Sequence, residues 1–448
     1  MIAEFLDERT IQDYVAAVRD AVDSPALQPH AAAAAQAIGR GAADPAEAIR
    51  ATLPQAAGPP SSAGQADFPF FSRDPAVSLL QTSLEDEARK AGNVAVKDPE
   101  SPLQHIVHAV EALLRLERFG PKDPDWVTKI AAATLDRLAK GNHRFNDVPA
   151  EKTIADDARL VIVGDWGSGL PRALEVARHM RARVEEALAA GRQAHVIHLG
   201  DVYYSGDPVE YRRRVLTDGR WPVTTDLANA GVTSWGLNGN HDMYSGGYGY
   251  FDTLLGDDRF AHQRSPDGRG TSFFRLRNAF WDIAGLDTSW DANVLSLGQR
   301  GVLHDPQAAV LERWAKESDR RLMLLSHHQL VSAYDLHDLG TVLPFKLESL
   351  LKSRRISAWL WGHEHRCMGF SAAEVPVMRC IGHGGIPVPS STIRDPLPKP
   401  GVWQETDTFA ERNCTWVRFG FAMLDFNDAA VTATYCDDEG KPTRTETF

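Results

Sequence analysis

Two different hydrophobic patterns divide the chain. Over roughly the first 150 residues, apolar side chains recur at the three- and four-residue spacing that is typical of amphipathic helices. Asp44-Pro45 and Asp123-Pro124 each combine a capping residue with proline at the first helical position. We therefore expect an all-helical N-terminal module over residues 1–150, with a flexible loop over 54–68 and no catalytic motif. The expected helices cover residues 4–23, 30–52, 76–91, 102–118 and 124–140.

After residue 150 the chain changes to short apolar runs that are typical of buried strands. Five of these runs are followed directly by polar residues, and the spacing predicts an amphipathic helix over 171–190 after the first run. Turn signals at Asn427-Asp428 and Asp437-Asp438 indicate antiparallel strands near the C-terminus. We therefore expect a second domain of the α/β class over residues 151–448. The five runs cover residues 160–163, 196–199, 233–237, 322–325 and 358–361, and the antiparallel strands are expected at 377–381, 416–425 and 430–436.

Length and composition limit the classes of protein to which this chain can belong. A chain of 448 residues is too long for one ordinary core, which agrees with two domains. The formal net charge of −12 argues against sequence-independent binding of nucleic acid. We find no apolar run of about 18 residues and therefore expect no membrane span.

The N-terminal sequence and the cysteines bear on the compartment. The N-terminus is acidic and lacks a basic region followed by an apolar core, the pattern of a secretory signal. The four cysteines share no Cys-x-x-Cys spacing, which favours reduced thiols over a disulfide framework. We therefore expect a cytoplasmic protein. Its alanine-rich N-terminal helices suit either an oligomerisation surface or a simple lid or packing layer.

The polar residues after the five apolar runs have the chemistry of metal ligands. Carboxylate, amide, phenolate and imidazole groups suit divalent or trivalent ions. Because open α/β sheets place their ligand sites outside the carboxyl ends of the strands, we expect these side chains to lie together. Each motif alone is a weak signal, whereas five in order are a specific one. The residues are Asp165; Asp201 with Tyr204; Asn240 with His241; His327 with His328; and His363 with His365.

The series of motifs resembles that of the calcineurin-like metallophosphoesterases over about residues 157–437. It is most similar to the purple acid phosphatase branch, and this resemblance implies a four-layer α/β/β/α sandwich. The motifs read Gly164-Asp165-Trp166-Gly167, Gly200-Asp201-Val202-Tyr203-Tyr204, Gly239-Asn240-His241-Asp242, His327 and Gly362-His363-Glu364-His365.

Two positions favour the purple acid branch. Most of the superfamily has a histidine ligand where this chain has Gly167, and the branch replaces it with the tyrosine three residues after the bridging aspartate, here Tyr204. A phenolate is a hard anionic donor, so the resemblance implies Fe(III) in the first site. Alternatively, Tyr204 is a packing residue and not a ligand, and the first metal site lacks one ligand. We expect Tyr203 to be a packing residue.

The resemblance also implies a role for each residue. His241 would protonate the leaving oxygen, and Asp242 would orient its imidazole. His327 and His328 both stay candidates for the fourth motif, since Gln329 stands where the family usually has proline. The first ion would be held by Asp165, Tyr204 and His365, the second (iron, zinc or manganese) by Asn240, His327 and His363, and Asp201 would bridge them.

We therefore expect a metal-dependent hydrolase of phosphate esters, in which a dinuclear centre activates a hydroxide for in-line attack on a phosphorylated small molecule. A phosphomonoesterase of the purple acid type is the leading interpretation. The alternatives are a phosphodiesterase on the same site and a catalytically silent regulatory or binding module. The filled ligand positions and the presence of His241 favour an enzyme.

Overall fold

The computed structural model describes residues 8–37, 50, 53, 70–92, 122–291, 301–334, 342–411 and 414–448. The chain divides into two compact units between Gly141 and Asn142, and the first unit also contains two three-residue segments from later in the chain. The expected domain boundary at residue 150 lies shortly after this division. The expected loop at 54–68, the helix at 102–118 and the Asp44-Pro45 cap lie outside the described residues.

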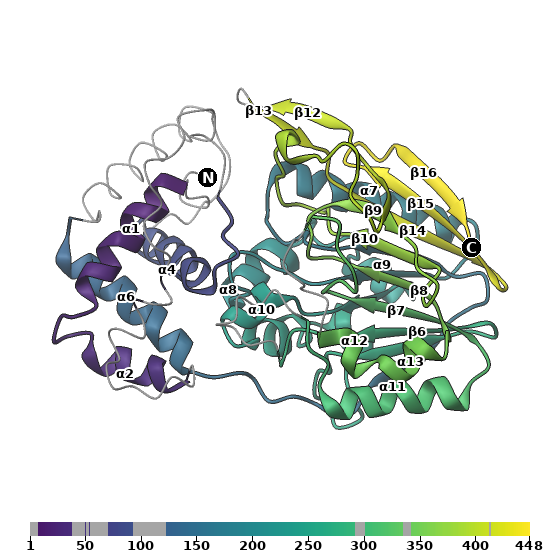
Figure 1. Ribbon diagram of the computed structural model, residues 1–448, viewed down its shortest axis with the longest axis horizontal. Coiled ribbons are helices and arrows are strands. Elements are labelled where there is room, and N and C mark those ends of the chain that lie inside the picture. Colours follow the sequence, from purple (N-terminus) through teal and green to yellow (C-terminus); the bar gives the residue numbers. More distant parts are fainter. Residues whose placement is uncertain are drawn as a thin grey trace. The chain divides into compact units, whose positions relative to one another are not determined.

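The described residues of the first unit before Gly141 are mainly helical (Figure 1). Its helices bury one apolar face each, and side chains such as Ile11, Leu80 and Ile130 form a single core. The Asp123 carboxylate accepts hydrogen bonds from the backbone N–H groups of Asp125 and Trp126, so the expected cap is present. The helices are α1 (Glu8–Ala21), α2 (Gln28–Ala37), α4 (Pro75–Gly92) and α6 (Pro124–Ala139).

The second unit contains two mixed sheets and a two-stranded ribbon (Figure 1). The first sheet has the order β1 (Ala150–Thr153), β5 (Phe274–Arg277), β6 (Trp281–Leu286), β7 (Arg321–Ser326), β8 (Ile356–Trp361), β10 (Val377–Ile381), β9 (Cys367–Phe370), β11 (Gly401–Gln404). The second has the order β16 (Pro442–Thr447), β15 (Ala430–Asp437), β14 (Gly420–Asn427), β2 (Arg159–Val163), β3 (Ala194–His198), β4 (Thr233–Gly236). The ribbon pairs β12 (Thr408–Glu411) with β13 (Cys414–Val417), so the strand expected at 416–425 is divided between β13 and β14.

Alternation of side chains along β7 assigns the two faces of the eight-stranded sheet to different cores. Met323 and Leu325 pack in the core shared with the six-stranded sheet, whereas Leu322 and Leu324 pack in a core with Trp314 of α11 (Asp305–Glu317). Helix α7 (Pro171–Ala189) contacts β2, β3 and β14 of the six-stranded sheet. These layers are consistent with the expected sandwich.

Shorter helical segments connect the strands. They are α8 (Pro208–Glu210), a π-helical segment at Tyr211–Leu216, α9 (Thr225–Asn229), α10 (Asn240–Tyr244), a π-helical segment at Gly249–Leu254, 3₁₀ turns at Asp258–Gln263 and Ser390–Thr392, α12 (Val342–Lys346) and α13 (Glu348–Lys352).

Parallel neighbours within each sheet place the expected ligands. Strands β2, β3 and β4 are parallel and adjacent, and so are β7 and β8 in the other sheet. The five polar motifs follow these five strands, so their residues gather at the carboxyl ends of both sheets. The four cysteines are free thiols. Among the described helices, none has the length and apolar character needed to cross a membrane.

Candidate metal centre

Four of the expected ligands have a left-handed backbone conformation. The φ angles are 56° at Asp165, 72° at Asp201, 68° at His363 and 54° at His365. Residues other than glycine rarely adopt this conformation, which costs about 1–3 kcal/mol each and is concentrated at functional sites. The surrounding structure therefore holds these side chains in place at the turns after β2, β3 and β8.

The first cluster contains Asp165, Asp201 and His365. Asp165 Oδ1 lies 3.3 Å from His365 Nε2. The hydroxyl oxygen of Tyr203 lies 3.1 Å from Asp165 Oδ1, 3.1 Å from Asp201 Oδ2 and 2.9 Å from His365 Nε2. Two carboxylates, one imidazole and one phenol therefore converge in this cluster.

The tyrosine in this cluster differs from the expected one. We predicted Tyr204 as a ligand and Tyr203 as a packing residue, but the hydroxyl that reaches the cluster belongs to Tyr203. The guanidinium of Arg214 lies 4.8 Å from the centre of the Tyr204 ring. Which of two adjacent tyrosines faces the site depends on the path of the turn after β3, and the sequence pattern carries no signal for that path.

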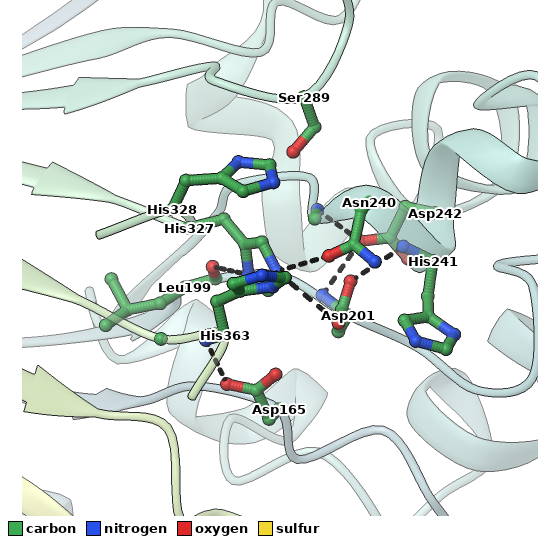
Figure 2. A network of polar contacts seen from close by, with 12 residues as sticks. Asp165, Leu199, Asp201, Asn240, His241, Asp242, Ser289, His327, His328 and His363 are labelled. Atoms are coloured by element: carbon green, nitrogen blue, oxygen red, sulfur yellow. Dashed lines mark hydrogen bonds and ion pairs between the residues drawn. The ribbon is translucent and has the colours of Figure 1, made fainter. Parts of the chain in front are cut away.

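The second cluster contains His327, His328 and His363. His327 Nε2 lies 3.0 Å from Asn240 Oδ1, 3.2 Å from His363 Nδ1 and 3.4 Å from Asp201 Oδ2. Figure 2 shows these side chains pointing toward one another, with Asp165 beside His363. Asp201 therefore contacts both clusters, as a bridging carboxylate must.

Both histidines of the fourth motif reach the second cluster, on different sides. His327 Nδ1 lies 2.9 Å from the carbonyl oxygen of Leu199, a contact that places the proton on Nδ1 and directs Nε2 toward Asp201 and Asn240. His328 Nδ1 lies 2.9 Å from Thr288 Oγ1 instead. Thr288 was not among the expected site residues because it follows β6, a strand outside the five motifs.

The electrostatics of the centre favour a cation. Burial opposes ionisation of Asp201, yet His327 and His241 hold the pKa of that carboxyl well below its usual range. Burial also works against a charged His327, but Asp201 and Asp165 raise the pKa of His327 to about 9. The same negative potential that holds a proton on this imidazole favours a metal ion.

His241 lies beside the first cluster. Its backbone N–H donates to Asp201 Oδ1 at 2.9 Å, and its ring centre lies 4.4 Å from that of Tyr203. His241 Nδ1 lies 2.6 Å from the carbonyl oxygen of Tyr204. Because a carbonyl only accepts, Nδ1 carries the proton in the neutral imidazole, and Nε2 gains one only when the ring is protonated.

Asp242 has a role different from the one expected. We predicted that it orients His241. Its carboxylate instead accepts hydrogen bonds from the turn after β3 and from the turn after β4, and so connects the two turns. Burial and the neighbouring Asp201 raise the pKa of Asp242 to about 7, against the hydrogen bonds that favour the carboxylate. Those bonds come from the backbone N–H groups of Asp201, Val202 and Gly239 and from the hydroxyl of Tyr211, at 2.9, 3.0, 2.7 and 2.7 Å.

The donor sets fit two metal ions. The first cluster combines two carboxylates, an imidazole and a phenol, and the second adds an amide oxygen and imidazoles to the shared carboxylate. Oxygen and nitrogen donors of this kind suit iron, zinc or manganese. All of these groups are buried, so few water molecules compete with them for a cation. The two clusters are therefore consistent with a dimetal site.

Residues 158–367 match the family model described as calcineurin-like phosphoesterase. This segment is a calcineurin-like phosphoesterase domain. It holds every expected ligand from Asp165 to His365. No curated protein sequence matches the chain.

Several solved structures are similar to part of this chain. GAP50, the anchor in the inner membrane complex of Plasmodium, is 12% identical with a TM-score of 0.45, and the match covers 65% of this chain and 88% of that one. A dimetal phosphatase from Danio rerio is 12% identical with a TM-score of 0.43, covering 65% and 98%. Vps29 from Chaetomium thermophilum is 12% identical with a TM-score of 0.27, covering 65% and 97%.

Proposed function

We propose that the protein is a metal-dependent hydrolase of phosphate esters, and specifically a phosphomonoesterase of the purple acid phosphatase type. The observation that carries this proposal is the contact of Asp201 with both ligand clusters. A pair of ions, when bound, neutralises phosphoryl oxygens and lowers the pKa of water toward neutrality. The substrate class is a phosphorylated small molecule.

The protein's own residues hold and orient the ligands. The Leu199 carbonyl fixes the tautomer of His327, and the backbone N–H of His363 donates to Asp165 Oδ2 at 2.7 Å. The second of these contacts ties a ligand of the first cluster to one of the second. We propose Fe(III) at the first cluster and iron, zinc or manganese at the second.

His241 is the proposed general acid. Its Nδ1 hydrogen bond to the Tyr204 carbonyl holds the ring while Nε2 gives its proton to the leaving oxygen. The imidazole then returns to the neutral form with its proton on Nδ1. This step matters most for esters whose leaving oxygen is strongly basic.

The test compares metal content and turnover in one set of variants. Wild-type protein should contain about two ions per chain and hydrolyse p-nitrophenyl phosphate faster than bis(p-nitrophenyl) phosphate. Asp201→Asn should lose metal and activity together. A metal-loaded wild type that is inactive on both esters would overturn the enzyme proposal, and selective turnover of the diester would replace the monoesterase with a phosphodiesterase.

His241→Ala separates proton donation from metal binding. This variant should keep both ions and lose about 10²–10⁴-fold in kcat on an alkyl phosphate. Its loss on p-nitrophenyl phosphate should be smaller, because p-nitrophenolate leaves without a proton. Equal losses on the two esters would show that His241 acts in another way.

A further inference from the structure

We infer that the hydroxyl of Tyr203, and not that of Tyr204, is the phenolic ligand of the first metal ion. The inference rests on the proposed dinuclear function and assigns one of its ligands. In the motif Gly200-Asp201-Val202-Tyr203-Tyr204, it moves the phenolate one residue closer to the bridging aspartate than the resemblance implies.

The distances are those of neighbouring ligands around one ion. Bonds from metal to oxygen or nitrogen are about 2.0–2.2 Å, so two donors at right angles around an ion lie about 3 Å apart. The Tyr203 oxygen lies 3.1, 3.1 and 2.9 Å from Asp165 Oδ1, Asp201 Oδ2 and His365 Nε2. One side-chain oxygen thus meets this distance to all three members of the first cluster.

A single hydrogen bond from Tyr203 accounts for only one of its two close contacts with carboxylate oxygens. A phenol has one proton to donate, and the two carboxylate oxygens beside it can only accept. The Tyr203 hydroxyl can donate to Asp165 or to Asp201, which leaves the other close oxygen pair without a proton between them. A cation bound among the oxygens of Tyr203, Asp165 and Asp201 would stabilise all three side chains at once. These three side chains are buried from solvent.

Tyr204 is held in different surroundings. Its ring lies against Arg214, whose guanidinium is 3.8 Å from the Glu210 carboxylate. Glu210 also accepts the backbone N–H groups of Tyr204 and Ser205 at 2.5 and 3.0 Å, so this part of the turn is fixed. The backbone carbonyl of Tyr204, not its hydroxyl, makes the contact with His241.

The same assignment links the metal site to the general acid. The Tyr203 ring lies 4.4 Å from the His241 ring at an interplanar angle of 50°. A ligand bond at the Tyr203 oxygen would hold the aromatic surface against which His241 packs. Tyr203 is therefore a ligand and also a positioning residue for His241.

Tyr203→Phe and Tyr204→Phe form a matched pair for the test, since each removes one hydroxyl from adjacent rings. Each full-length variant is loaded with ferric ion alone, and bound iron is measured by competition with a chelator and by the visible phenolate-to-iron absorption band. Tyr203→Phe should abolish the band and weaken binding at one site at least tenfold. Tyr204→Phe should retain both properties.

Two results would overturn the assignment. One is loss of the band in Tyr204→Phe with retention in Tyr203→Phe, and the other is unchanged iron binding in Tyr203→Phe. If Tyr203→Phe does not fold, the metal-loaded wild type is crystallised and the first ion is located by anomalous scattering. A Tyr203 oxygen about 2 Å from that ion supports the assignment, and one beyond about 3 Å overturns it.

These readouts do not depend on turnover. A wild type that binds two ions but hydrolyses no phosphate ester contradicts the proposed function and leaves the Tyr203 assignment open to the same measurements. An active wild type whose iron binding is insensitive to Tyr203→Phe contradicts the assignment alone. A wild type that binds no metal contradicts both.

Discussion

Asp242 shows how a single carboxylate can organise the turns that carry the two ligand clusters. Each of its two oxygens accepts two hydrogen bonds, one pair from Val202 and Tyr211 and the other from Asp201 and Gly239. In Asp242→Asn, an amide NH₂ replaces one oxygen, and two buried donors lose their acceptor. Each unsatisfied group costs about 1–3 kcal/mol.

We expect Asp242→Asn to lower both the melting temperature and the affinity for metal. Differential scanning calorimetry of the metal-free protein separates the first effect from the second. Tyr211→Phe is the matched control because it removes only one of the four hydrogen bonds. A normal melting temperature and normal metal affinity in Asp242→Asn would show that the turns are held by other contacts.

At the scale of elements, the turn after β4 must approach the ligands very closely. A Cβ atom added to Gly239 would lie 2.0 Å from Asp201 Oδ1 and 2.7 Å from His327 Cε1. Gly239→Ala should therefore displace two ligands and abolish binding of at least one ion, as measured by metal analysis. Gly236→Ala, in β4 itself, places its Cβ 3.1 Å from Leu254 Cδ2 and should keep both ions.

The strands that carry the site could be predicted because each is an apolar run that ends in polar residues. Strands without that ending were harder to predict. Strand β1 has the sequence Ala-Glu-Lys-Thr, which is not an apolar run. It is stabilised by parallel pairing with β5, and no local sequence pattern reveals this pairing. The same limit applies at residue level. The choice between Tyr203 and Tyr204, and the contact of Thr288 with His328, depend on turns whose path is set by tertiary packing.

At the scale of the whole molecule, buried histidines make stability depend on pH. Burial, with smaller effects from Lys152 and His262, lowers the pKa of His195 to about 3. The unfolded chain binds a proton at this histidine near pH 6.5, whereas the folded chain does not do so above about pH 3. Between these values the unfolded state binds more protons, so the free energy of unfolding decreases as the pH falls.

His195→Asn should reduce this pH dependence. Asparagine can hydrogen-bond to Thr233 Oγ1, which lies 2.7 Å from His195 Nδ1, but it does not titrate. We expect the melting temperature of the variant to fall less than that of wild type between about pH 7 and pH 4. Parallel pH profiles for the two proteins would show that other groups determine acid stability.

The proposed ligands of each ion come from both sheets, and this origin has a consequence for the metal-free protein. Asp165, Asp201 and Asn240 follow strands of the six-stranded sheet, whereas His327, His363 and His365 follow strands of the eight-stranded sheet. Bound ions would therefore act as cross-links between the two sheets at one end of the sandwich. On chelation, we expect amide hydrogen exchange to accelerate first at the carboxyl ends of β2, β3, β7 and β8, while the opposite ends of these strands stay protected.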